Sequence, residues 1–258
     1  MSIASDHIVK SFDEELKQLS DIVIQMGGLA ESQLQIAVDA LIKRDPELGG
    51  QVVRSDAQID ELEQRIGQLV VKTLALRQPM ARDLRHVVAS LKIASDLERM
   101  GDYAANVGKR AIALSQMQPL KPMNAIPRMA KLVLAIIKDV IDAYIELDAG
   151  KAIDVWNRDE EVDEMYTSLF RELLTYMMED PRNITGCTHL LFVAKNIERI
   201  GDHATNIAET VHFLVVGRNI EATRPKGDTS SFAVMTPPED ENGDDEDGGD
   251  VAPGGARP

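Results

Sequence analysis

Residues 96–107 read DLERMGDYAANV, and residues 196–207 read NIERIGDHATNI. The two stretches share Glu-Arg, Gly-Asp, Ala and Asn at an offset of 100 positions. A set of aspartates recurs at an offset of 103 positions: Asp45, Asp56 and Asp60 match Asp148, Asp159 and Asp163. Two independent blocks at nearly the same offset indicate that a unit of roughly 100 residues has been duplicated within the chain.

Each unit is expected to consist of three long helices. Apolar residues recur at intervals of three and four, as in Ile59, Leu62 and Ile66. An aspartate precedes Pro46 and Pro181, and Asp followed by Pro suits an N-cap and the first helical position. The pattern predicts an all-α protein, a tandem pair of three-helix bundles with six long helices. Their expected ranges are 5–43, 46–77, 80–116, 125–147, 150–179 and 182–216.

The composition divides the chain into three segments. Residues 1–121 are the expected first bundle and residues 122–217 the second. Residues 218–258 contain ten acidic and four basic residues and few apolar ones. Too little apolar surface is present there to offset the entropy of ordering, so this acidic C-terminal tail is predicted to be disordered.

Charge and composition exclude several classes of protein. The formal net charge of −15 disfavours binding to nucleic acid. No signal peptide is recognisable, and no apolar run approaches the ~18 residues of a membrane span, so direct membrane insertion is not expected. The single cysteine, Cys187, permits no intramolecular disulfide and fits a reducing compartment. These features predict a cytoplasmic protein.

Each predicted bundle carries two pairs of acidic residues spaced four apart. They are Asp56/Asp60 with Glu98/Asp102, and Asp159/Asp163 with Glu198/Asp202. The first two pairs are centred 21 residues before and 21 after Pro79, and the second two lie 20 before and 19 after Pro181. Antiparallel helices joined near these prolines would therefore bring four carboxylates to one height in each bundle.

Four converging carboxylates would form a hard oxygen site that suits Mg²⁺, Ca²⁺, Mn²⁺ or oxidised iron. Asn106 and Asn206 lie four residues beyond each second pair and could add neutral oxygen ligands. Arg99 and Arg199 support another interpretation, in which the acids form an ion-pair network without metal. The spacing alone leaves both interpretations open.

These motifs resemble the PhoU family of phosphate-uptake regulators. The family carries two E/D-x-x-x-D signatures on paired three-helix bundles, and residues 98–102 (ERMGD) and 198–202 (ERIGD) resemble it closely. Two further segments are similar to PhoU sequences: SFDEELKQLSDIVIQMGGLAE and RQPMARDLR. The resemblance covers residues 6–217 and excludes the acidic tail.

The resemblance implies a function as well as a fold. PhoU-like proteins bind multinuclear iron or other metal clusters through these acids, so iron is the first expectation here, with Mn, Mg or Zn as alternatives. The metal ligands carried over are Asp56, Asp60, Glu98, Asp102, Asp159, Asp163, Glu198 and Asp202, with Asn106 and Asn206 as possible additions. The family implies a homodimer whose partners are the ATPase of the phosphate ABC transporter and a sensor histidine kinase. It represses the phosphate-starvation response and phosphate import.

No enzymatic activity is expected, although two alternatives remain. Glu209-Thr-Val-His212 matches Glu-x-x-His, and an acid also precedes His86 in Asp83-Leu-Arg-His86, as a di-metal carboxylate oxidase would require. The two motifs are not equivalent in the repeat, which disfavours an oxidase. A structural adaptor without metal is the second alternative.

Overall fold

The computed structural model describes residues 2–120, 124–222, 224 and 228, with side chains described from residue 12 onward. The first half forms α1 (Ser2–Lys43), α2 (Pro46–Arg77) and α3 (Ala81–Ser115). The second half forms α4 (Ile126–Glu146), α5 (Ala149–Asn157), α6 (Asp159–Glu179), the 3₁₀ turn η2 (Pro181–Asn183) and α7 (Ile184–Val216). No strand occurs among these residues.

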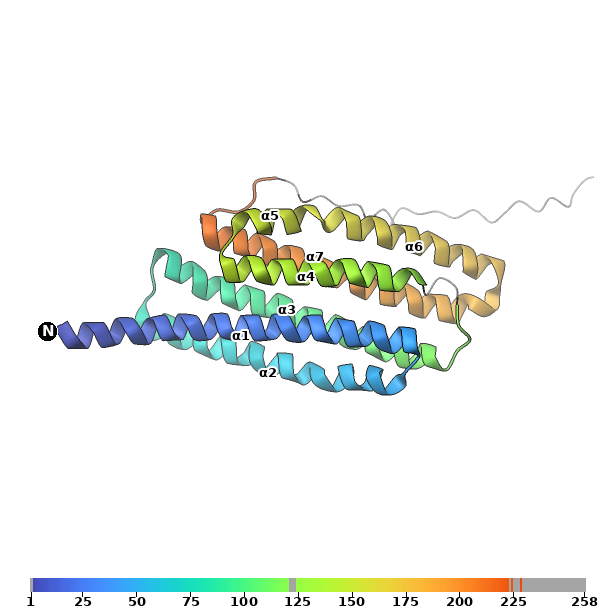
Figure 1. Ribbon diagram of the computed structural model, residues 1–258, viewed down its shortest axis with the longest axis horizontal. Coiled ribbons are helices and arrows are strands. Elements are labelled where there is room, and N and C mark those ends of the chain that lie inside the picture. The colour runs from blue at the N-terminus through green and yellow to red at the C-terminus, as the bar shows by residue number, and fades with distance from the viewer. Residues whose placement is uncertain (1, 121–123, 223, 225–227, 229–258) are drawn as a thin grey trace, which may run out of the picture.

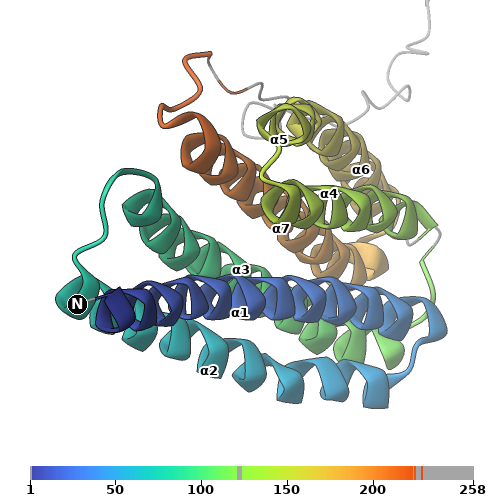
Figure 2. The same ribbon diagram turned by 60° about the vertical axis from the view of Figure 1, so that its left-hand side comes forward.

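The helices form two bundles that lie against each other. Helices α1, α2 and α3 make one bundle, and α4, α5 with α6, and α7 make the other (Figure 1). The bundles meet where α3 packs along α7 and α1 packs on α4, and the second view shows their axes crossing at an angle (Figure 2). The predicted all-α tandem of three-helix bundles is confirmed.

Aspartate caps begin the second helix of each bundle. The Asp45 side chain accepts hydrogen bonds from the backbone N–H groups of Glu47 and Leu48, at 2.9 and 3.3 Å. Asp148, its counterpart in the repeat, caps α5 in the same way, although no proline follows it. Each cap satisfies backbone donors at the helix start that lack an intrahelical partner. Asp180 instead caps the short turn η2, and α7 begins after it.

The fifth predicted helix is interrupted, which the sequence pattern did not indicate. It divides at Arg158 into α5 and α6. The backbone N–H of Arg158 bonds to the carbonyl of Val155, three residues earlier, rather than to the residue four earlier. The break allows consecutive side chains to face different partners. Arg158 donates to Asp139 of α4 at 2.7 Å, whereas Asp159 is buried towards α7.

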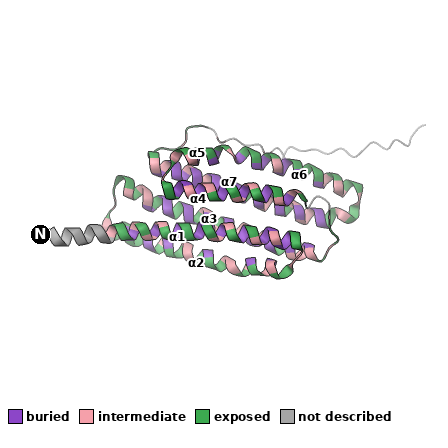
Figure 3. Cartoon of the chain, in the orientation of Figure 1, coloured by how far each residue is buried: buried purple, intermediate pink, exposed green. Residues whose placement is uncertain are grey.

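One apolar core runs through both bundles (Figure 3). Buried Val, Ile, Leu, Met and Ala side chains make up most of this core. Helices α2 and α3 approach closely at Gly49 and Gly108, where a Cβ on either glycine would lie 2.9 Å from the other's carbonyl oxygen. This close crossing lies near the first group of acidic residues and holds α2 against α3 there.

Two further predictions concern the ends of the chain and the membrane. The predicted disordered tail, residues 218–258, falls largely outside the described residues, although Arg224 and Asp228 are described. The boundaries at residues 121 and 217 remain predictions. Within the described ranges, no helix has the length and apolar character of a membrane span.

Candidate metal sites

Helices α2 and α3 bring the acidic residues of the first bundle together. Asp56 and Asp60 lie on α2, and Glu98 and Asp102 lie on α3; these four residues are called the first site. Charges act between the two helices here. Asp102 on α3 contributes to raising the pKa of Asp56 on α2, and Asp60 on α2 contributes to raising the pKa of Glu98 on α3. The two pairs thus lie near enough for their charges to interact, and their role as a metal site remains a prediction.

Gly101, inside the ERMGD signature, allows α2 to approach α3 at the first site. A Cβ on Gly101 would lie 2.9 Å from Ile59 Cδ1 and 3.2 Å from both Asp56 Oδ1 and Gln33 Oε1. Gln33 belongs to α1 and is buried, and its Oε1 atom has no hydrogen-bond partner among the described residues. An unpaired neutral oxygen and the carboxylate of Asp56 thus both adjoin Gly101.

The first site carries more negative charge than its surroundings balance. Partial burial raises the pKa of Asp56, and the charges of Asp102 and Asp60 raise it further. Burial also raises the pKa of Glu98, with Asp102 adding to the effect and Arg99 opposing it. Arg99 lies 3.6 Å from Glu98 and 3.5 Å from Asp102, and more than half of its side chain is exposed. An exposed ion pair at such distances contributes little to the stability of the folded protein.

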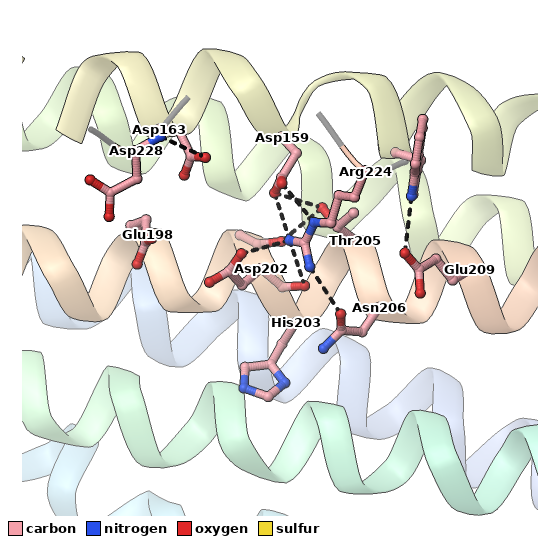
Figure 4. A network of polar contacts seen from close by, with 12 residues as sticks. Asp159, Asp163, Glu198, Asp202, His203, Thr205, Asn206, Glu209, Arg224 and Asp228 are labelled. Atoms are coloured by element: carbon pink, nitrogen blue, oxygen red, sulfur yellow. Dashed lines mark hydrogen bonds and ion pairs between the residues drawn. The ribbon is translucent and has the colours of Figure 1, made fainter. Parts of the chain in front are cut away.

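The second site consists of Asp159 and Asp163 on α6 and Glu198 and Asp202 on α7. It is more deeply buried than the first, since the exposed fractions of Asp159, Asp163 and Glu198 are only 2, 3 and 4%. Charged carboxylates at such depth require a cation or hydrogen-bond donors. Figure 4 shows the groups that meet Asp159 and Asp163.

Arg224, from the segment after α7, lies at the centre of the second site. Its Nε and Nη2 atoms donate to the two carboxylate oxygens of Asp159 at 2.7 and 2.8 Å, a bidentate pair. Nη2 also donates to Asp202 Oδ1 at 2.6 Å, and Nη1 donates to Asn206 Oδ1 at 3.2 Å (Figure 4). The hydroxyl of Thr205 donates to Asp159 as well, at 3.1 Å.

Lys195 compensates the other end of the second site. Its ammonium group donates to Glu198 Oε1 at 2.8 Å and to Asp228 Oδ2 at 3.0 Å. Burial would lower the pKa of Lys195, but these two hydrogen bonds outweigh burial and raise it. Burial raises the pKa of Glu198 to about 7 even though Lys195 opposes the shift, and Asp202 and Asp163 contribute to it. Glu198 Oε2 is buried and has no partner among the described residues.

The residues of both sites fit an oxygen-ligated cation in chemistry. Each site has four carboxylates. A buried oxygen without a hydrogen-bond partner belongs to Glu198 in the second site and to Gln33 next to the first. In the part of the chain that the structure describes, however, no three His, Cys, Asp or Glu side chains are already arranged to hold a metal ion. Small side-chain movements would therefore have to accompany binding of Mg²⁺, Mn²⁺ or oxidised iron, the hard cations that such ligands prefer.

The two histidines of the oxidase interpretation, and Arg199 of the ion-pair interpretation, contact other groups. Nε2 of His86 lies 2.9 Å from the hydroxyl of Ser20 and 3.3 Å from that of Tyr144, and His212 Nδ1 lies 3.1 Å from the carbonyl of Arg218. An Arg199 ion pair does not form among the described residues; its guanidinium lies 5.5 Å from the ring centre of Tyr103. An ion-pair network does exist in the second site, but other cations make it.

Several residues of the sites were not found from the sequence: Gln33, Lys195, Thr205, Arg224 and Asp228. Lys195 stands three residues before Glu198, a spacing that could have indicated the pair. Gln33 comes from another helix, and Arg224 lies in a segment without apolar periodicity, so no local pattern indicated either residue.

Comparison with known proteins agrees with this architecture. The model of the PhoU domain matches residues 23–111 and again residues 126–211. A PhoU homologue of Caulobacter vibrioides, named as a phosphate-specific transport system accessory protein, is 54% identical over 228 residues, covering 88% of this chain and 99% of the relative. A homologue of the same name from Rhizobium meliloti is 51% identical over 232 residues, covering 89% of this chain and 98% of the relative.

Solved structures give the same answer. The crystal structure of PhoU from Pseudomonas aeruginosa superposes with a TM-score of 0.78 at 40% identity, covering 80% of this chain and all of that chain. The regulatory protein PhoU of the phosphate transport system from Streptococcus pneumoniae superposes with a TM-score of 0.76 at 30% identity, covering 82% and 100% of the two chains. With both halves matched and the duplicated ERMGD and ERIGD signatures in place, this chain belongs to the PhoU family.

Proposed function

We propose that this protein is a cytoplasmic negative regulator of the phosphate-starvation response and of phosphate import. It would connect the ATPase of a phosphate ABC transporter to a sensor histidine kinase. The observation that carries the proposal is the pair of acidic sites held at matching positions in the two halves of a PhoU fold. Relatives across nearly their whole length are named as accessory proteins of phosphate-specific transport, and no feature of the described residues points to catalysis.

The first site is the better candidate for metal. Asp56, Asp60, Glu98 and Asp102 would hold the ion, and Gln33, whose Oε1 atom adjoins Gly101 as Asp56 does, would be an additional ligand. A bound cation would neutralise the mutual repulsion that raises the pKa values of Asp56 and Glu98 and would join α2 to α3. Iron is the first expectation from the family resemblance, with Mn, Mg or Zn as alternatives.

Docking to other proteins would use exposed helix surface. Apolar side chains are exposed around the turn from α2 to α3, with Val71 at 68%, Leu76 at 66% and Met80 at 79%. Grouped exposed apolar side chains are typical of protein contact surfaces. A homodimer and contacts with the ATPase or the kinase all remain proposals. Size-exclusion chromatography with light scattering of the wild type and a Leu76→Asp, Met80→Asp variant would test the homodimer.

A metal-free adaptor is the second candidate, and Arg224 is the observation that favours it. In the second site, a guanidinium already performs the charge compensation that a metal would provide. Metal analysis of protein purified without chelators separates the two candidates, because an adaptor would contain no bound metal.

The regulatory role is tested by deleting the gene in a strain that carries a phosphate-starvation reporter. The proposal predicts that the reporter is expressed constantly in phosphate-rich medium and that the wild-type gene restores repression. Normal repression in the deletion strain, together with unchanged phosphate uptake, would contradict the proposal.

A further inference from the structure

The two acidic sites differ in one respect that the duplication does not explain. Arg224 binds Asp159, Asp202 and Asn206 in the second site. Each of these residues has a chemically identical counterpart in the first half at the offsets of 103 and 100: Asp56, Asp102 and Asn106. In the described part of the chain no guanidinium binds Asp56 or Asn106: Arg99 lies 3.5 Å from Asp102 but is more than half exposed, and Asn106 accepts from Lys109 at 3.2 Å.

Arg224 uses the same oxygen atoms that a cation would need. Both carboxylate oxygens of Asp159 and Oδ1 of Asp202 accept its N–H groups at 2.6 to 2.8 Å. A hard metal ion binds carboxylate oxygens at ~2.0–2.6 Å and carries its own positive charge. The guanidinium and a metal ion therefore compete for these oxygens, because both are positively charged and repel each other at such short separations.

Arg224 fills the site incompletely. Its guanidinium contacts Asp159 and Asp202, and the ammonium group of Lys195 contacts Glu198 and Asp228. Glu198 Oε2 is buried without a hydrogen-bond partner among the described residues. Because this buried carboxylate oxygen lacks a donor, a cation of higher charge that also reached Glu198 would be stabilised further in place of the guanidinium.

We propose that Arg224 is a built-in competitor for metal at the second site, so that a metal ion binds Asp159 and Asp202 only when the guanidinium withdraws. This inference rests on the proposed metal binding of the acidic sites. It makes the two sites unequal: the first accepts a cation directly, whereas the second must first release Arg224. Binding of a metal ion at the second site would then displace Arg224. The contacts that Arg224 makes with Asp159, Asp202 and Asn206 would be lost.

Trp156 makes this competition measurable. It is the only tryptophan in the chain and lies three residues before Asp159. Its Nε1 atom donates to Glu209 at 3.0 Å, and Glu209 follows Asn206 by three residues on α7. Terbium(III), a hard oxygen-seeking ion, emits when a nearby tryptophan transfers its excitation energy. Excitation at the tryptophan band thus reports terbium in the second site, and equilibrium dialysis reports total bound terbium.

The experiment compares Arg224→Gln with Arg218→Gln in the full chain. Arg218 precedes Arg224 by six residues and is exposed, and among the described residues its side chain makes no hydrogen bond or ion pair with either site, so Arg218→Gln removes an equal charge from the same segment. We expect Arg224→Gln to lower the terbium concentration for half-maximal sensitised emission at least tenfold, and Arg218→Gln to behave as the wild type. An unchanged half-maximal concentration in Arg224→Gln, or an equal change in both variants, would overturn the proposal.

Two additional measurements keep the result interpretable. If circular dichroism shows that Arg224→Gln does not fold, Arg224→Lys replaces it in the comparison. Lysine retains the positive charge but lacks the planar group that binds both oxygens of Asp159. Sensitised emission of this variant should therefore reach half its maximum at a severalfold lower terbium concentration than in the wild type. Wild-type behaviour of Arg224→Lys would then overturn the proposal. If dialysis shows bound terbium but the half-maximal concentration does not depend on Arg224, only the competition by Arg224 is contradicted. If dialysis shows no bound terbium at all, the metal binding on which this inference rests is contradicted as well.

Discussion

Gly101 faces Asp56 across the contact between α3 and α2, so closely that a Cβ at this position would lie 3.2 Å from Asp56 Oδ1. Its counterpart Gly201 has more room: the nearest atom to a Cβ there would be Val162 Cγ1, at 3.4 Å. In the first half, the glycine of the signature is thus needed for the close approach of α2 to α3. In the second half, the space around Gly201 could accommodate a methyl group.

Gly101→Ala should therefore destabilise the protein and Gly201→Ala should not. The new methyl group would displace the buried Ile59 side chain, and overpacking of this kind costs about 1–3 kcal/mol. At Gly201 the methyl group meets ordinary contacts, and alanine favours helix by up to about 1 kcal/mol. Urea unfolding of the two variants measures both effects. Equal stability losses would show that the tight fit at Gly101 is not what separates the halves.

The capping aspartates give a second prediction. Asp45→Ala and Asp148→Ala should each reduce the free energy of unfolding by about 1 kcal/mol, because the first backbone N–H groups of α2 and α5 lose their acceptors. Asp154→Ala is the matched control, since Asp154 is exposed within α5 and caps nothing. Chemical unfolding followed by circular dichroism makes the comparison. A loss at Asp154 as large as at the caps would contradict the assignment.

His86 gives a prediction about pH. Burial lowers its pKa, against the opposing charge of Asp83, so the folded state holds the imidazole neutral beside Ser20 and Tyr144. In the unfolded chain a histidine titrates near about pH 6.5. Below that pH the unfolded state binds a proton that the folded state resists, so stability is retained above pH 6.5 and is lost as the pH falls.

The measurement compares the wild type with His86→Gln in urea at pH 7.5 and at pH 5.5, in the presence of a chelator. The wild type should lose more stability between the two pH values than the variant, since glutamine does not titrate. An identical loss in both proteins would show that His86 does not contribute to the pH dependence.

The sequence was sufficient for the parts of this molecule that depend on local pattern. The duplicated ERMGD and ERIGD motifs, the aspartate before Pro46 and the distances from Pro79 located the helices and paired the acidic residues across them. Long-range contacts were not accessible in this way. Arg224 reaches the second site from a segment without periodicity, so only the folded chain places it beside Asp159.

The break at Arg158 was missed for a related reason. The apolar spacing continues through residues 150–179, and neither proline nor glycine interrupts this part of the sequence near Arg158. The interruption accompanies two opposed side-chain contacts, Arg158 with Asp139 and Asp159 with Arg224, and both involve residues distant in sequence. Its consequence for the site is direct, because Asp159 is the first residue of α6.

Metal content tests the central claim most directly. The comparison is between wild-type protein purified without chelators and a Glu98→Gln, Asp102→Asn variant, with elemental analysis of both. These substitutions keep the shapes of the side chains and remove mutual repulsion, so the variant should unfold at no lower urea concentration than the wild type. The account predicts bound metal in the wild type that is lost from the variant. Equal metal content in two folded proteins would show that these carboxylates are not the ligands.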